Sequence, residues 1–259
     1  MTSIDNVFKK PRHKALVAYA TTGYPDMETT LKAVPVLARA GCDIIELGIP
    51  FSDPLADGAT IQKASFLALE KGVTPDVCLE TAKSLGKKVD TPLVFMTYLN
   101  PVMRYGYRQF CNACRESGVS GLIIPDLPPE EGTSLGEAAT GQGINLIYLA
   151  APTSTQERIR LIARQSGGFI YVVSLTGVTG ARRELSADLP AFISALRRIT
   201  DKPLCVGFGV STPEQAAQAA RLADGVIIGS RIIQLIEEDP SLAALEGFIC
   251  DVRAALDAT

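Results

Sequence analysis

The sequence of 259 residues contains no tryptophan and a single histidine. That residue, His13, stands in the basic stretch 9–14, where we expect a solvated side chain rather than a ligand or a base. A Ser-His-Asp triad, a histidine-rich zinc site and a metal-dependent aldolase site all need histidine among the reacting groups. The scarcity of histidine disfavours these classes of chemistry, and we expect no metal site.

Cysteine is also sparse, with six residues spread over positions 42, 78, 111, 114, 205 and 250. This spacing is not that of a disulfide framework, so we expect reduced thiols. Cys111 and Cys114 have the spacing of a redox or metal pair, but they stand in a helical pattern. We therefore expect two thiols packed on one helical face.

Long apolar runs and an excess of one charge are missing as well. No run approaches the roughly 20 apolar residues that a membrane span needs, and residues 1–14 contain no apolar core of a signal peptide. The formal net charge of −3 gives no sign of a nucleic-acid or anionic-membrane partner. We expect a cytoplasmic protein that binds a small soluble molecule, with no nucleic-acid and no membrane partner.

Eight short apolar runs recur along the chain, each followed by a helical pattern. The expected strands are 15–20, 44–47, 93–98, 121–124, 144–149, 169–173, 203–206 and 225–228. Asp26, Thr74 and Ser154 stand where helix N-caps are expected, and one helix is expected from about 104 to 117. Without a linker or a break in composition, this alternation favours an α/β fold. We expect a single-domain (β/α)8 TIM barrel over residues 1–259, with a short N-terminal helical extension, rather than an open sheet with a second domain.

One acid interrupts the second expected strand. Glu46 lies in the apolar run from Ile44 to Leu47, where a carboxylate is costly unless it is paired or used. Strand alternation places Glu46 and Gly48 on one face; if that face points into the barrel, Glu46 lies near the mouth and Gly48 leaves room for a ligand. Asp57 follows on a proline- and glycine-rich loop, so the two form a candidate acid/base pair. The alternatives are a structural ion pair for Glu46 and a plain turn role for Asp57.

Glycines follow three successive expected strands, the sixth, the seventh and the eighth. They stand in Thr179-Gly180, Gly207-Phe208-Gly209 and Gly229-Ser230. Backbone amides at glycine can approach an anion closely, and a helix amino terminus adds a favourable dipole. Because barrels commonly bind phosphate at this place, the pattern predicts a phosphate site, with ordinary turn glycines as the alternative. The glycine-spaced segment 174–183 is typical of a mobile lid.

The placement of lysines distinguishes carbon–carbon cleavage through a lysine Schiff base from cleavage by carboxylates. Lys14 and Lys202 precede expected strands, and no lysine stands at a strand's carboxyl end. A Schiff-base aldolase is therefore disfavoured. A cleavage of this kind would have to run on carboxylates.

The segment from Ile45 to Gly58, Ile-Glu-Leu-Gly-Ile-Pro-Phe-Ser-Asp-Pro-Leu-Ala-Asp-Gly, resembles the most specific signature of the tryptophan synthase alpha subunit family. The match spans essentially the whole chain. Its remaining motifs are matched in order by Ser174, Thr176-Gly177-Val178-Thr179-Gly180, Gly207-Phe208-Gly209 and Gly229-Ser230. Two residues depart from the family pattern. Ala59 replaces the usual proline, and Tyr19 stands where phenylalanine is common, which would place a hydroxyl in the pocket.

The resemblance implies a lyase that cleaves indole-3-glycerol phosphate to indole and glyceraldehyde 3-phosphate by a retro-aldol reaction. Glu46 would protonate the ring carbon that bears the side chain and then accept the side-chain hydroxyl proton, while Asp57 would stabilise charge at the ring nitrogen. Burial would favour the protonated form of Glu46.

The resemblance also assigns binding roles. Thr179 would reach Asp57. The apolar slot for the ring would be lined by Tyr19, Ile61, Met96, Ile123, Leu149, Tyr171 and Phe208. The phosphate would be held by Gly180, Gly209, Gly229 and Ser230.

In that family the alpha subunit pairs with a beta subunit, which contains pyridoxal phosphate and turns indole into L-tryptophan. The resemblance thus implies an α2β2 complex, no cofactor in this chain, and a partner facing Asp53 and Asn100-Pro101. Three alternatives remain at this point: a stand-alone indole-releasing lyase, a phosphosugar isomerase on the same barrel, and a catalytically silent barrel that binds phosphate.

Overall fold

The computed structural model describes residues 4–173, 188–207 and 209–259. Its strands are all parallel and pair in the order β5-β4-β3-β2-β1-β9-β8-β7-β6. They are β1 (Ala15–Thr21), β2 (Ile44–Gly48), β3 (Leu93–Met96), β4 (Val119–Ile123), β5 (Asn145–Ile147), β6 (Leu149–Ala150), β7 (Ile170–Val173), β8 (Leu204–Gly207) and β9 (Gly225–Ile228).

The short strands β5 and β6 are two parts of one barrel position, on either side of Tyr148. β5 pairs with β4 and β6 pairs with β7, while the Tyr148 carbonyl accepts a hydrogen bond from the Tyr171 amide at 3.0 Å. The sheet therefore closes through eight positions, and the prediction of a (β/α)8 barrel is confirmed.

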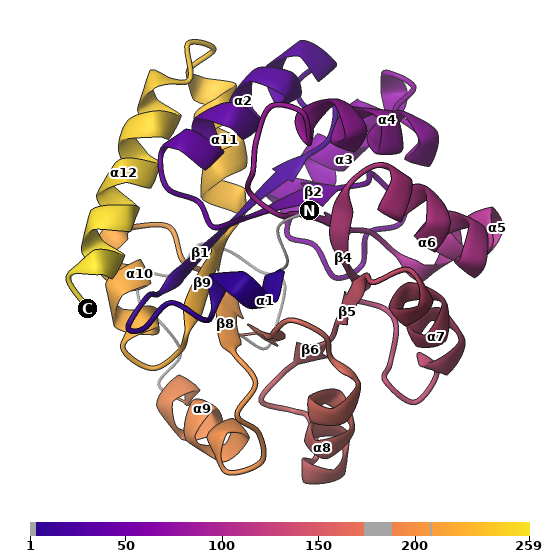
Figure 1. Ribbon diagram of the computed structural model, residues 1–259. Coiled ribbons are helices and arrows are strands. Elements are labelled where there is room, and N and C mark those ends of the chain that lie inside the picture. Colours follow the sequence, from indigo (N-terminus) through magenta and orange to yellow (C-terminus); the bar gives the residue numbers. More distant parts are fainter. Residues whose placement is uncertain (1–3, 174–187, 208) are drawn as a thin grey trace.

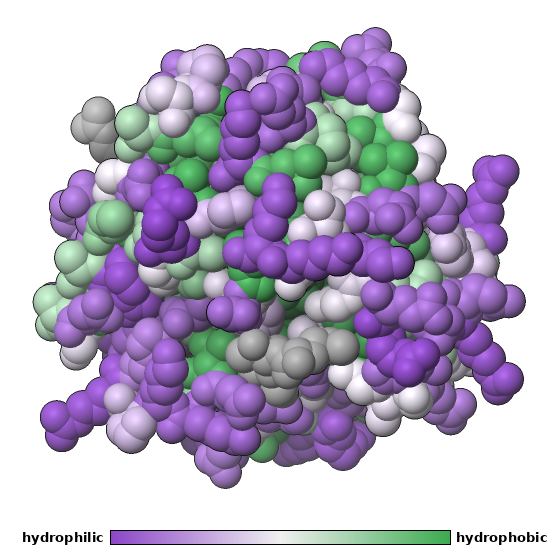
Figure 2. Space-filling view, turned by 45° about the horizontal axis from the view of Figure 1, so that its top comes forward, coloured by the Kyte–Doolittle hydropathy of each residue, from purple (hydrophilic) through white to green (hydrophobic). Residues whose placement is uncertain are grey.

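Helices surround the barrel as an outer ring, except α1 (Ile4–Val7), which lies across one end of the barrel (Figure 1). The helices of the ring are α2 (Met27–Arg39), α3 (Ala59–Glu70), α4 (Pro75–Leu85), α5 (Leu99–Tyr105), α6 (Tyr107–Glu116), α7 (Thr133–Gly141), α8 (Gln156–Gln165), α9 (Leu189–Arg197), α10 (Pro213–Ala220), α11 (Ser230–Glu238) and α12 (Ala243–Asp257). None of the described helices is long and apolar enough to cross a membrane. On the face shown in Figure 2, apolar residues form small patches between hydrophilic side chains.

Two of the three predicted N-caps are confirmed, because the capping side chains are local. Asp26 accepts a hydrogen bond from the Thr29 amide at the start of α2, and Thr74 accepts one from Val77 at the start of α4. The N-cap predicted at Ser154 is wrong by one residue, since Thr155 accepts from the Arg158 amide at the start of α8.

The single helix predicted over 104–117 is also wrong. Gly106 adopts a φ of 91°, which ends α5 and separates it from α6. α5 begins earlier than predicted, at Leu99, whose backbone amide donates to the Asp126 carboxylate at 2.9 Å. Cys111 and Cys114 are free and fully buried on α6, as predicted.

Strand side chains alternate between the barrel interior and the helix layer. The inner cluster includes Val17, Tyr19, Ile44, Val94, Met96, Ile123, Tyr171, Cys205 and Ile227. Ile45 and Leu47 belong to the outer cluster, under the helices. The predicted alternation along β2 is therefore confirmed, and Glu46 shares its face with Ile44. At the end of the barrel where strands begin, the fully buried Ile4 of α1 lies against Gly121 and Gly168 and closes the interior.

The predicted solvation of His13 is wrong. Its Nε2 atom lies 2.7 Å from Asp43 Oδ1, and its side chain is 20% exposed. The other Asp43 oxygen accepts hydrogen bonds from the Leu16 amide at 2.9 Å and from Arg253 at 3.2 Å. This acid joins the N-terminal arm, the start of β2 and α12 in one charged cluster.

Candidate active site

Glu46 lies inside the barrel with 1% of its surface exposed. In the strand register it stands between Tyr19 of β1 and Val94 of β3. Within the described ranges neither carboxylate oxygen has a hydrogen-bond partner, and no ion pair involves Glu46. Burial, with a smaller contribution from the negative charge of Asp57, raises the pKa of Glu46 to about 8. These observations argue against the alternative of a structural ion pair.

Asp57 is brought to the same site by the loop that follows β2. Its backbone is fixed by two hydrogen bonds: its amide donates to Pro54 at 3.1 Å, and its carbonyl accepts from the Gln62 side chain at 2.8 Å. Asp57 is 4% exposed, and its Oδ1 atom has no hydrogen-bond partner among the described residues. Burial raises the pKa of Asp57 to about 6. A plain turn residue would instead lie in solvent.

Tyr98, just after β3, is a site residue that sequence reasoning missed. Its hydroxyl accepts a hydrogen bond from the Ala56 amide at 3.0 Å, and its ring stacks on Phe51 with centroids 5.3 Å apart. Hydrogen bonding from the same hydroxyl lowers the pKa of Asp57 and so partly opposes the effect of burial. Tyr98 therefore holds the Asp57 loop. Its place at a strand's carboxyl end was the signal that could have revealed it.

The two carboxyl groups have different protonation states at neutral pH. With a pKa of about 8, Glu46 keeps its proton, whereas Asp57, with a pKa of about 6, has lost its own. Two acids whose environments separate their pKa values in this way can serve as a proton donor and as a fixed negative charge.

The sequence suggested that Gly48 leaves room for a ligand. In the structure the Tyr19 side chain occupies that space. A Cβ atom at Gly48 would lie 2.2 Å from the Tyr19 hydroxyl oxygen. A similar arrangement exists across the barrel, where a Cβ atom at Gly207 would lie 2.5 Å from the ring of Tyr171. Both tyrosines are buried, and burial together with Asp57 and Glu46 raises their pKa values.

The other residues predicted for the ring slot are partly brought together. Met96 and Ile123 lie with Tyr19 and Tyr171 in the inner cluster, and the half-buried Ile61 and Leu149 pack against it. Ile61 lies in the first turn of α3. Phe208 and Thr179 lie outside the described residues.

The predicted phosphate residues lie partly within the described ranges. Gly229 precedes α11, whose first residue, Ser230, is exposed. A Cβ atom at Gly229 would lie 3.4 Å from Tyr19 Cβ, so this helix start borders the inner cluster. Gly209 is exposed, with a φ of 85°, whereas Gly180 and the predicted lid, 174–183, lie outside the described residues.

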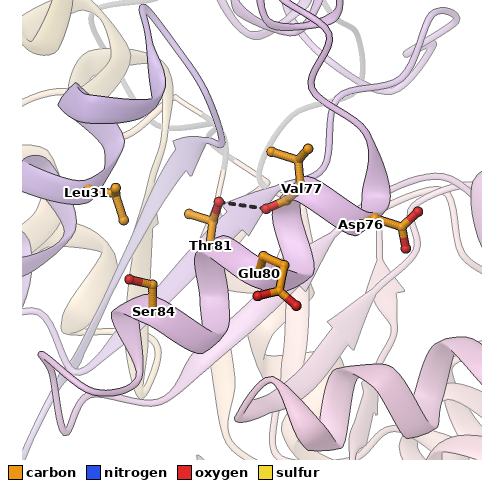
Figure 3. A pocket seen from close by; sticks show the side chains of 6 residues that line it. All are labelled: Leu31, Asp76, Val77, Glu80, Thr81 and Ser84. Atoms are coloured by element: carbon orange, nitrogen blue, oxygen red, sulfur yellow. Dashed lines mark hydrogen bonds between the residues drawn. The ribbon is translucent and has the colours of Figure 1, made fainter.

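Two hollows on the outside of the barrel contain none of these residues. One lies between α2 and α4 and is lined by Leu31, Asp76, Val77, Glu80, Thr81 and Ser84 (Figure 3). The other runs along α7 toward the end of α8. Within the described part of the chain no three His, Cys, Asp or Glu side chains are grouped as metal ligands. The absence of a metal site stays a prediction.

A parallel barrel of eight strand positions with a buried acid pair at the carboxyl end of one strand defines a class of barrel enzyme that works by acid/base chemistry. Comparison with known proteins gives the family. The family model described as tryptophan synthase alpha chain matches residues 6–252. The tryptophan synthase alpha chain of Dehalococcoides mccartyi is 55% identical over 257 residues, which cover 99% of this chain and 100% of that one.

Solved structures agree with this assignment. The crystal structure of tryptophan synthase subunit alpha from Legionella pneumophila matches with a TM-score of 0.91 and 36% identity, covering 100% of both chains. A structure of Mycobacterium tuberculosis tryptophan synthase matches with a TM-score of 0.92 and 38% identity, covering 99% of both. The chain therefore belongs to the tryptophan synthase alpha chain family. These lyases cleave indole-3-glycerol phosphate to indole, which the beta subunit uses for tryptophan synthesis.

Proposed function

We propose that Glu46 and Asp57 carry out the cleavage of indole-3-glycerol phosphate in this chain, Glu46 as proton donor and acceptor and Asp57 as electrostatic stabiliser. The observation that carries the proposal is the pair of buried carboxyl groups on one barrel end, with pKa values of about 8 and about 6. At neutral pH the first is an acid ready to donate, and the second is a negative charge ready to stabilise a cation.

In the proposed reaction Glu46 alone donates one proton and takes one back. Protonated Glu46 donates its proton to the ring carbon that bears the side chain, which gives an indolenine cation with its charge at the ring nitrogen. Ionised Asp57 stabilises that charge. Glu46, now a carboxylate, takes the proton of the hydroxyl on the adjacent chain carbon. The bond between ring and chain breaks, its electron pair returns to the ring, and the products are indole, glyceraldehyde 3-phosphate and protonated Glu46.

The surrounding residues bind and orient the substrate in this proposal. The ring enters an apolar slot lined by Tyr19, Ile61, Met96, Ile123, Leu149, Tyr171 and Phe208. The phosphate is held by backbone amides and a hydroxyl at Gly180, Gly209, Gly229 and Ser230, where α11 offers its amino terminus to the anion. Thr179 approaches Asp57. The clustering of the described slot residues and the position of Gly229 against Tyr19 support this arrangement.

A beta subunit docks, in this proposal, at the loop after β2 and at α5. Asp53 and Asn100 are exposed there, and so are two large apolar side chains, Leu55 at 77% and Met103 at 55%. Exposed apolar residues near charged ones are typical of a protein interface. The partner carries pyridoxal phosphate, this chain carries no cofactor, and the assembly is α2β2. The six free cysteines fit work in the reducing cytoplasm.

The test is the rate of indole release from indole-3-glycerol phosphate by the chain alone and with a beta subunit. Glu46→Gln is expected to lower kcat by about 100-fold or more, since it removes the proton donor, and Asp57→Asn to lower it strongly as well. Glu137→Gln, a change at an acid on the outer helix α7, is the matched control and leaves the rate unchanged.

Each alternative has its own outcome in this test. A rate that does not rise with the beta subunit indicates a stand-alone lyase. Full function in Glu46→Gln indicates a catalytically silent barrel. Isomerisation of a phosphosugar without indole release indicates the isomerase.

A further inference from the structure

The Tyr19 side chain spans the inner face of β1 from one glycine to another. Gly229, before α11, lies next to its Cβ and the near edge of its ring, because a Cβ atom there would be 3.4 Å and 3.5 Å away from them. Gly48 of β2 lies at its hydroxyl end. Tyr19 thus forms a wall between the helix start proposed for the phosphate and the strand that carries Glu46.

The hydroxyl at the end of this wall is paired with one other hydroxyl. Tyr19 Oη lies 3.2 Å from Thr21 Oγ1, and both residues are buried, at 5% and 2% exposure. Among the described residues neither hydroxyl has another hydrogen-bond partner. Two hydroxyls have two protons and four lone pairs, so one bond between them leaves one donor and several acceptor positions unused. At 3.2 Å that bond is also long for two hydroxyls.

An unused donor and acceptor are costly inside a protein unless a bound group satisfies them. Burial raises the pKa of Tyr19, and the charge of Asp57 raises it further, so the hydroxyl stays protonated and can donate at neutral pH. A substrate with its ring beside Glu46 and its phosphate at α11 must run its connecting chain past this wall.

We propose that the Tyr19 and Thr21 hydroxyls form a hydrogen-bonding subsite for a hydroxyl of the phosphorylated three-carbon chain of the substrate. This inference rests on the function proposed above and adds to it a source of selectivity. The subsite favours hydroxylated chains over plain alkyl chains of the same length. A site built to bond a hydroxyl discriminates against a ligand that lacks it, because its own polar groups then stay unpaired.

The experiment compares two ligands on three variants. One ligand is indole-3-glycerol phosphate, measured as kcat/KM, and the other is indole-3-propanol phosphate, which keeps ring, chain length and phosphate but has no chain hydroxyls, measured as an inhibition constant. Tyr19→Phe and Thr21→Val are each expected to lower kcat/KM by about fivefold, the worth of one hydrogen bond. Both leave the inhibition constant of the propanol compound within about twofold.

The double variant Tyr19→Phe/Thr21→Val loses less than the product of the two single effects, because the hydroxyls serve one subsite. Tyr148→Phe, which removes a tyrosine hydroxyl from the outer cluster, changes neither constant. If Tyr19→Phe does not fold, Thr21→Val gives the same readout.

Equal losses for both ligands, or no loss for either, overturn the subsite. If the unaltered protein neither cleaves the first ligand nor binds the second, the proposed function itself has failed. The two failures are therefore distinguishable.

Discussion

Two acids three residues apart in the sequence, Asp43 and Glu46, have opposite surroundings in this barrel, since one is paired and the other, among the described residues, is not. Asp43, where the strand begins, contacts His13 and Arg253 and accepts a hydrogen bond from the Leu16 amide. Glu46, nearer the strand's end, has no partner within the described ranges. The first acid ties chain segments together. The second makes no such contacts there, and its burial without a partner has a cost in stability that a paired structural acid does not carry.

The largest expected effect concerns the cost in stability of the buried Glu46 carboxyl group. In the unfolded chain Glu46 loses its proton near the ordinary glutamate pKa of 4.5, whereas in the folded protein it loses it near 8. The free energy of unfolding therefore falls as pH rises between these values, since the folded state holds a proton that the unfolded state has released. Glu46→Gln should stabilise the protein by about 4 kcal/mol at pH 8 and by almost nothing at pH 4. Denaturant titrations at the two pH values measure this difference, and an equal change at both would contradict it.

Asp43→Asn should act in the opposite direction. Removing this acid leaves His13 and Arg253 without their shared partner, so the free energy of unfolding should fall by about 3 kcal/mol at pH 7. The kcat of the folded variant should not change, because the cluster lies at the other end of the barrel. Asp90→Asn, at a residue in the connection before β3, is the control for stability. A loss of kcat in Asp43→Asn without a loss of stability would contradict the structural role of Asp43.

The smallest effect is expected at Tyr98. Tyr98→Phe removes the hydrogen bond that lowers the pKa of Asp57, so that pKa should rise above about 6. The acid limb of the pH–rate profile should move upward by about 0.7 pH unit, which is the fivefold worth of one hydrogen bond, so kcat should fall about fivefold on that limb and by less than about twofold at pH 7. Tyr148→Phe is the matched control. An unmoved acid limb would show that Tyr98 supports the loop without acting on Asp57.

Sequence reasoning succeeded where the physical cause is local or periodic. Alternation along β2 placed Glu46 inside the barrel, and the eight apolar runs gave the eight barrel positions. Asp26 and Thr74 were recognisable as caps because each bonds a backbone amide three residues away. It failed at Gly106, since a glycine inside a helical pattern does not reveal its own φ angle.

The remaining errors concern contacts between distant parts of the chain. His13 was expected in solvent because it stands in a basic stretch, and its partner Asp43, 30 residues away, does not belong to that local pattern. Gly48 was interpreted as space for a ligand, whereas the space belongs to the ring of Tyr19 on the neighbouring strand. Tyr98 was included in an apolar strand, and nothing in its neighbours shows that its hydroxyl reaches Ala56. The roles of Glu46, Asp57 and the binding residues stay predictions.

The most direct test of the proposed acid/base pair is a titration of the Glu46 carboxyl group. Carbon-13 NMR of protein labelled at glutamate carboxyls would follow it, with the Glu46 signal assigned by its loss in Glu46→Gln. We predict a midpoint near 8, so that Glu46 is a proton donor at neutral pH. A midpoint near 4.5, the ordinary value for glutamate, would contradict the proposal, because Glu46 would then be ionised at neutral pH and could not start the reaction.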